Sequence, residues 1–69
     1  MDVRSEMMGS VWKVLAREGE DVVAGQTLMI LESMKMEIQI DSPVSGVVVS
    51  IGVVEGQVIE DGQLLAQVE

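Results

Sequence analysis

The chain has 69 residues, a formal net charge of −8 at pH 7, and neither cysteine nor histidine. These features exclude disulfides and thiolate metal sites, and they remove the commonest general base and metal ligand. The negative charge also disfavours nucleic acids and anionic membranes, because both attract clusters of Lys and Arg.

Length and hydropathy predict one small domain over residues 1–69 with an aliphatic core. Hydrophobic residues make up 48% of the chain, yet Trp12 is its only aromatic residue, and we expect Trp12 to pack on that core. The charged segment Met1–Glu6 lacks the apolar run of a signal peptide, and no run approaches the roughly 18 residues of a spanning helix. We therefore expect a cytoplasmic protein without a membrane partner.

In chain order, the first half predicts a strand, a turn, a short extended piece, a second turn and a second strand. Runs rich in Val, Ile and Leu favour strands, and glycine accepts the positive φ that many turns need. The corresponding ranges are Ser10–Leu15, a turn at Glu18-Gly19, Asp21–Val23, a turn at Gly25, and Gln26–Leu31.

Residues 32–37, Glu-Ser-Met-Lys-Met-Glu, come next in the chain. Met, Lys and Glu all favour helix, but both flanks are strand-like and too short to be helices. Thr27–Leu31 precedes the hexapeptide, and the alternating stretch Ile38–Asp41 follows it. The segment therefore predicts a β-hairpin with Lys35 at a two-residue tip.

After the hairpin, the chain repeats the order of the first half. A turn over Ser42–Gly46, which contains Pro43, predicts the crossing between the two halves. The later elements are Val47–Ile51, a turn at Glu55-Gly56, Val58–Glu60, a turn at Gly62, and Gln63–Val68.

An internal repeat accounts for this order. Adding 37 to residue numbers 9–32 gives 46–69 without a gap, and eight of the 24 pairs are identical. Three glycine pairs share the register: Gly9/Gly46, Gly19/Gly56 and Gly25/Gly62. Two similar halves in one small domain predict a pseudo-twofold axis, and many short strands predict an all-β sandwich or flattened barrel of two antiparallel sheets.

The repeat also places the hairpin. Adding or subtracting 37 carries Lys35 just beyond either end of the chain. The hairpin tip and the paired termini should therefore take equivalent positions at opposite ends of the molecule. Since a six-residue strand spans roughly 20 Å, the tip should project well away from the termini.

Lys35 has two interpretations from the residues alone. An exposed lysine is usually a solubilising charge, and we interpret Lys13, inside the strand, in that way. Met34 and Met36 could fill gaps in a core, but a two-residue tip in so small a domain cannot bury both side chains. Two exposed methionines beside a lysine form a soft apolar patch, which indicates a surface that a partner contacts.

The hexapeptide resembles the attachment motif of biotinyl domains, in the biotin/lipoyl attachment family, where a Met-Lys-Met triplet at a hairpin tip carries biotin. The resemblance runs from about Val3 to Glu69, and its other motifs are Gly19, Gly25-Gln26, Ser42–Val47, Glu55–Val58 and Gly62–Leu65. Many members have Ala where this chain has Ser33. The ungapped repeat also leaves no room for the thumb of some bacterial acetyl-CoA carboxylase carriers, so the chain resembles a short thumbless carrier, free-standing or excised from a longer protein.

The resemblance implies a biotin carboxyl carrier that is not itself an enzyme, with no catalytic residue and no metal site. Lys35 would hold biotin through an amide bond. The residues that contact the ligase and the partner enzymes would be Met34, Met36, Glu32, Ser33 and Glu37. A biotin protein ligase must supply the activated cofactor, since the chain has no histidine to deprotonate an exposed amine. The carrier would then serve the biotin carboxylase and carboxyltransferase of an acetyl-CoA or propionyl-CoA carboxylase.

Two alternatives stay open. A lipoyl carrier, with lipoate on the same lysine, shares the implied fold. That class usually shows Asp-Lys-Ala or a similar triplet, however, so Met-Lys-Met favours biotin. An unmodified interaction module of the same fold is the other alternative, and the hairpin lysine speaks against it.

Overall fold

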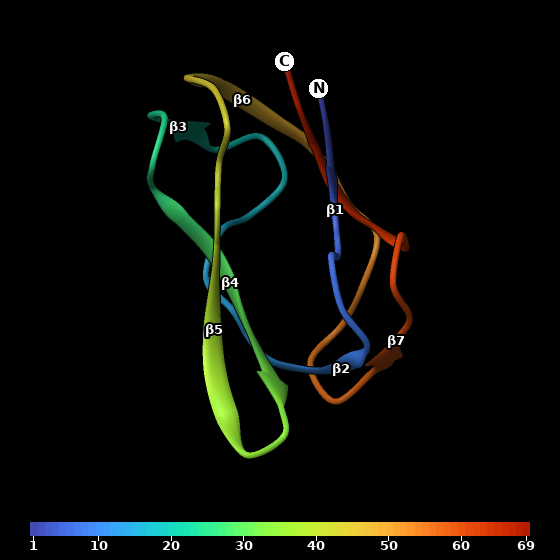
Figure 1. Ribbon diagram of the computed structural model, residues 1–69. Helices are drawn as coiled ribbons and strands as arrows, with labels where there is room; N and C mark the ends of the chain where they lie inside the picture. Colours follow the sequence, from blue (N-terminus) through green and yellow to red (C-terminus); the bar gives the residue numbers. More distant parts are fainter.

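The computed structural model describes residues 1–69 and consists of eight β-strands joined by turns (Figure 1). The strands are β1 (Asp2–Arg4), β2 (Gly9–Val14), β3 (Asp21–Val22), β4 (Thr27–Ser33), β5 (Met36–Asp41), β6 (Gly46–Ile51), β7 (Val58–Ile59) and β8 (Leu64–Val68). No helix of the structure is long and apolar enough to cross a bilayer.

The strands form two four-stranded sheets, in the orders β1-β8-β6-β3 and β5-β4-β2-β7. Every strand pair in both sheets is antiparallel. An offset of 37 residues relates the strands of one sheet to those of the other. The all-β sandwich of two antiparallel sheets predicted from the sequence is therefore confirmed.

Backbone hydrogen bonds confirm the pseudo-twofold relation of the two halves. The Gly19 amide donates to the Val48 carbonyl at 2.7 Å, and the equivalent Gly56 amide donates to the Val11 carbonyl at 2.7 Å. Each bond joins the turn of one half to the long strand of the other. Each half therefore supplies partners for backbone groups that the other half would leave unpaired.

The turn glycines adopt the positive φ that the sequence pattern predicted for them. Four of them have φ between 85° and 89°, a range that residues with a Cβ rarely adopt: Gly19, Gly25, Gly56 and Gly62. Pro43 lies in the bend that joins β5 to β6.

The repeat extends further toward the N-terminus than residue 9. In β1, Val3 lies opposite Ala66 of β8, and the equivalent Ile40 of β5 lies opposite Met29 of β4. The sequence pattern did not indicate β1, because a strand of three residues gives no clear alternation. β1 nevertheless completes its sheet in the way that β5 completes the other.

Polar contacts also hold β1 against β8. The Gln67 side-chain amide donates to Asp2 Oδ1 at 2.8 Å, and Arg4 Nη1 donates to the Gly62 carbonyl, just before β8, at 3.0 Å. Within β1, Arg4 also forms a salt bridge with Asp2 at 3.2 Å. The hydrogen bond from Gln67 is the main cause that lowers the pKa of Asp2 below its ordinary value, and Arg4 adds to it. These contacts help to keep a very short strand in its sheet.

The prediction that Trp12 packs on the core is wrong, since 44% of its surface is exposed. The register of β2 against β4 shifts between Val11 and Lys13, so Trp12 is the extra residue of a β-bulge and turns outward. The Lys13 ammonium lies 5.6 Å from the centroid of its ring. The equivalent Val49 of β6 sits at the same kind of shift and is also exposed.

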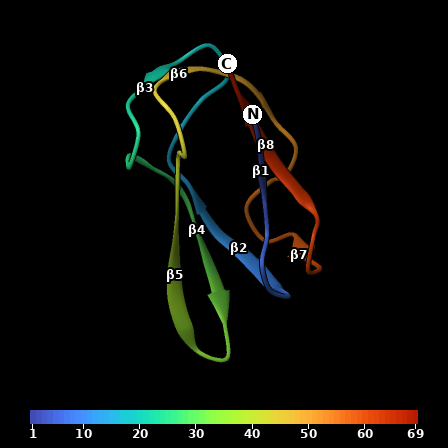
Figure 2. The same ribbon diagram turned by 45° about the horizontal axis from the view of Figure 1, so that its top comes forward.

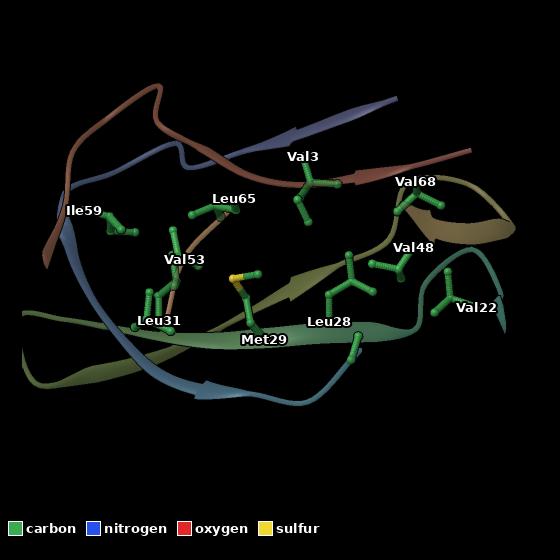
Figure 3. Close-up of a cluster of buried hydrophobic side chains, with 13 residues drawn as sticks. Val3, Val22, Leu28, Met29, Leu31, Val48, Val53, Ile59, Leu65 and Val68 are labelled. Carbon is green, nitrogen blue, oxygen red and sulfur yellow. The ribbon is translucent and has the colours of Figure 1, made fainter. Parts of the chain in front are cut away.

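The core lies between the two sheets and is aliphatic, as predicted (Figure 3). It contains 13 buried residues, and both halves contribute to it: Val3, Val11, Ala16, Val22, Leu28, Met29, Leu31, Val48, Val53, Ile59, Leu65, Ala66 and Val68. The side chains of β4 and β8 face each other across this space. Because neither half encloses these side chains alone, the core needs both halves together.

Gly9 and Gly46 are required for close approach rather than for a turn. The structure places Gly46 at the start of β6, not in the turn where the sequence pattern placed it. A Cβ on Gly46 would lie 2.5 Å from the backbone oxygen of Glu69, and a Cβ on Gly9 would lie 2.5 Å from that of Glu32. Only a residue without Cβ allows the paired first and last long strands of each half to approach so closely at this point.

We predict that Gly46→Ala lowers the free energy of unfolding by about 1–3 kcal/mol, because the new methyl group must push two backbones apart. Gly52→Ala is the matched control, since its Cβ would meet nothing closer than 3.5 Å. We expect Gly52→Ala to be neutral or stabilising by up to about 1 kcal/mol. Urea titrations measure both changes, and equal destabilisation by the two variants would contradict the close-approach explanation.

Candidate functional site

The hairpin of β4 and β5, residues 27–41, projects from one end of the molecule and is called the lysine finger below. Its strands pair in register up to Ser33, which lies opposite Met36. Only Met34 and Lys35 remain between them as the turn. The strands thus continue into the hexapeptide that local propensity alone would assign to a helix, because cross-strand pairing overrides helix preference there.

The two residues of the turn adopt a backbone conformation that is unfavourable for residues with a Cβ. Met34 has φ of 53° and Lys35 has φ of 64°, and they are the only non-glycine residues with positive φ in the structure. Two consecutive positive values are typical of a type I′ turn, for which Asn-Gly is the favoured pair. A residue with a Cβ loses roughly 1–2 kcal/mol in this conformation. The side chains of Met34 and Lys35 are therefore retained at a cost to stability, which indicates a function at the tip.

Lys35 is exposed at the tip and has no partner within the chain. Arg4–Asp2 is the only salt bridge of the structure, and no hydrogen bond from the Lys35 ammonium is formed. Lys13 differs, because its ammonium lies near the Trp12 ring. The Lys35 amine is thus unpaired and accessible to an external reagent.

The two methionines beside the lysine are also exposed. Met34 has 92% of its surface exposed and Met36 has 64%. Neither belongs to the buried core cluster. A thioether side chain adapts its shape to a contact surface, so this arrangement offers a flexible apolar contact on both sides of the amine.

The part of the lysine finger next to its tip carries two acids and a serine. Glu32 and Glu37 lie directly opposite each other in the pairing register, and both are exposed. Like charges in that position destabilise a hairpin slightly, and no cation of the chain neutralises them. Ser33 is partly buried, and its hydroxyl donates to the Met8 carbonyl at 2.9 Å.

The contact of Ser33 with Met8 braces the lysine finger against the segment that leads into β2. Gly9, the next residue, lies under the backbone of Glu32. The sequence showed that Gly9 belongs to the repeat, but it gave no signal for the hydrogen bond of Ser33. Together these contacts fix the direction in which the tip projects.

The lysine tip and the chain termini lie at opposite ends of the molecule, as the repeat predicts. Figures 1 and 2 show the N and C termini together at one end and the β4–β5 turn at the other. The Val68 amide donates to the Met1 carbonyl at 3.0 Å, so the ends are tied together. The longest dimension of the molecule is 31 Å.

One groove, of about 320 Å³, lies between the edges of β1 and β5. Its lining includes Val3, Met7, Ile40 and Pro43, and none of residues 32–37 takes part in it. The amine at the tip is therefore not the floor of a binding cavity. It is a free group on a protrusion, which suits a covalent attachment better than the binding of a small molecule.

Comparison with protein families gives a match to the family described as "Biotin-requiring enzyme", over residues 1–68. A biotinylated protein TB7.3 homolog from Mycobacterium leprae is 45% identical over 65 residues, which are 94% of this chain and 92% of that protein. The biotin/lipoyl attachment protein of Bacillus subtilis is 40% identical over 67 residues, with 97% and 92% covered. The biotin carboxyl carrier protein of acetyl-CoA carboxylase from Solanum lycopersicum is 40% identical over 60 residues, with 87% and 86% covered.

Solved structures agree with this match. Urea carboxylase from Kluyveromyces lactis contains a segment with a TM-score of 0.94 and 35% identity, which covers all of this chain and 6% of that much longer one. The lipoyl domain of the 2-oxoglutarate dehydrogenase complex from Azotobacter vinelandii has a TM-score of 0.86 at 21% identity, with 100% and 95% covered. At that identity the likeness shows the fold alone.

We predict that Met34→Asn raises the free energy of unfolding by about 0.5–1 kcal/mol, because Asn tolerates the positive φ of the turn better than Met. Met36→Asn is the matched control, since Met36 lies in the extended strand β5. Asn disfavours strands, so Met36→Asn should be neutral or slightly destabilising. Thermal unfolding compares the two variants, and a stabilisation by Met36→Asn that equals that by Met34→Asn would contradict the strained turn.

Proposed function

This chain belongs to the biotin/lipoyl attachment family, and on that premise we propose that Lys35 is the residue on which it carries biotin as a carboxyl carrier. The carrier role itself rests on the family match and on the carboxyl carrier protein among its relatives. The observation that carries the assignment to Lys35 is its unpaired amine on a strained two-residue turn, far from both chain ends. No other lysine of the chain has that setting.

The structure fits covalent attachment of biotin. In the proposed loading step, Lys35 Nζ gives up a proton and attacks the carbonyl carbon of biotinyl-adenylate, so that an amide forms and AMP leaves. The chain holds no cluster of acidic or other metal-ligating groups and no histidine near this amine. A biotin protein ligase would therefore supply both the activated acid and the base.

We assign separate contributions to the neighbours of Lys35. Met34 and Met36 provide soft apolar contacts for the ligase and later for the enzymes that the carrier visits. Glu32 and Glu37 draw the tip toward basic surfaces, and their mutual repulsion in the free domain is relieved by such a partner. Ser33 holds the strand next to the turn against Met8, so that the amine projects in one direction.

Biotin, when bound, supplies the ureido nitrogen that accepts and gives up the carboxyl group. The domain positions the cofactor: its rigid lysine finger presents the biotinylated Lys35 side chain at a biotin carboxylase and then at a carboxyltransferase. The domain itself catalyses neither step. We propose an acyl-CoA carboxylase of the acetyl-CoA or propionyl-CoA type as the enzyme served. The support is the relative named for acetyl-CoA carboxylase. We place this carrier, as one domain of residues 1–69, in the cytoplasm.

The test of the assignment is Lys35→Arg, which keeps the charge but cannot form the amide. Co-expressed with a biotin protein ligase, the unaltered protein should gain one biotinyl group in its intact mass, and Lys35→Arg should gain none. Lys13→Arg is the matched control and should label fully. Labelling that persists in Lys35→Arg would contradict the assignment, and a lipoyl increment in place of biotin would identify the alternative cofactor.

The acidic pair gives a second test. Glu32→Gln with Glu37→Gln should lower kcat/KM for biotinylation about three- to tenfold at low salt, with a smaller difference at high salt, because the attraction to a basic partner is lost. Glu60→Gln with Asp61→Asn removes the same charge from an exposed turn outside the lysine finger and should change little. Equal effects of the two double variants would show that only net charge matters.

A further inference from the structure

Methionine is distributed unevenly between the interior and the surface of this molecule. The chain has six methionines. Met29 is fully buried in the core, whereas Met8 has 69% of its surface exposed. Met8 and the two residues beside Lys35 form a group that we call the finger methionines: Met8, Met34 and Met36.

The finger methionines lie at the same end of the molecule as the lysine, although Met8 is far from it in the sequence. Ser33 lies opposite Met36 in the pairing of β4 with β5, and its hydroxyl donates to the Met8 carbonyl. The backbone of Met8 is thereby held beside β4, next to the residue that precedes the turn. Met1 is also exposed, by 61%, but it lies at the opposite end with the termini.

An exposed thioether reacts with peroxides. One oxygen of hydrogen peroxide is transferred to the sulfur, the O–O bond breaks and water leaves, so that the sulfur is oxidised to a sulfoxide and the peroxide is reduced. The product is polar and chiral, and methionine sulfoxide reductases convert it back. The reaction replaces an adaptable apolar contact by a polar one at the places where Met34 and Met36 flank the amine.

We propose that the finger methionines are an oxidation-sensitive modification site whose conversion to sulfoxides slows the loading of Lys35 until a methionine sulfoxide reductase restores them. This inference rests on the function proposed above for Lys35. The finger methionines contribute nothing to the buried core, so their oxidation leaves the fold intact. Oxidation of Met29 would disrupt that core, and its burial protects it.

The experiment treats the unloaded protein with hydrogen peroxide and follows each methionine by peptide mass spectrometry. Samples taken during the reaction are freed of peroxide and given to a biotin protein ligase with biotin and ATP. We expect Met34, Met36, Met8 and the distal Met1 to oxidise while Met29 stays unmodified. We expect kcat/KM for biotinylation to fall about tenfold as the finger methionines oxidise, with thermal unfolding still cooperative.

Two measurements distinguish the effect of oxidising the finger methionines from the effect of oxidation elsewhere in the chain. The triple variant Met8→Leu, Met34→Leu and Met36→Leu is compared with itself before and after peroxide, and that ratio should stay near one although Met1 still oxidises. Methionine sulfoxide reductases of both epimer classes should restore the rate of the oxidised unaltered protein. This recovery of the rate would identify the sulfoxides as the cause, because the experiment involves no substitution in the chain.

Several results would overturn the proposal. Protein fully oxidised at Met34 and Met36 could load at the rate of the unoxidised protein. The triple variant could lose the same share of its rate after peroxide, or Met29 could oxidise as fast as Met34. Failure of the unoxidised protein to load at all is a different outcome, because it would contradict the function assigned to Lys35.

Discussion

The close approach of backbones at Gly9 and Gly46 is the constraint on which the rest of this structure depends. Each glycine lies at the start of the first long strand of its half, beside the end of the last long strand of the same half. A Cβ at either glycine would lie 2.5 Å from a backbone oxygen of that neighbouring strand. At Gly9 the close neighbour is the backbone of Glu32, two residues before the turn of the lysine finger. The packing that closes the fold therefore also determines how the finger is directed.

The two halves of the molecule are equivalent in backbone, and the proposed attachment site lies where that equivalence ends. At one end β4 leads through the two-residue turn into β5, whereas the equivalent positions at the other end are the two chain termini. One end of the pseudo-twofold can therefore connect to other protein segments, and the other end is free to present a side chain. A reactive group at that free end can enter a partner while the core stays closed.

The sequence revealed those features that a repeat or a local pattern encodes. The 37-residue offset, the alternation on both sides of residues 32–37 and the spaced glycines predicted the sandwich, the pseudo-twofold and the position of Lys35. The identical pair Ser5 and Ser42 lies in the same register, but it falls outside the window in which the glycines align, so β1 was not indicated.

Features that arise from tertiary contacts could not be predicted in this way. Trp12 turns outward because β2 gains an extra residue against β4, and apolar character alone suggested burial. Gly46 was assigned to a turn, since the sequence does not show that its own strand approaches Glu69 so closely. The brace between Ser33 and Met8 joins residues 25 positions apart and leaves no local signal.

We propose that an unpaired amine on the strained tip of the lysine finger carries the cofactor of this domain. The most direct measurement is peptide mapping by mass spectrometry of the unaltered protein isolated from cells that contain a biotin protein ligase. We expect one biotinyl group per chain, on the peptide that contains Lys35. Biotin found on Lys13 or on the N-terminal amine, with Lys35 unmodified, would contradict it.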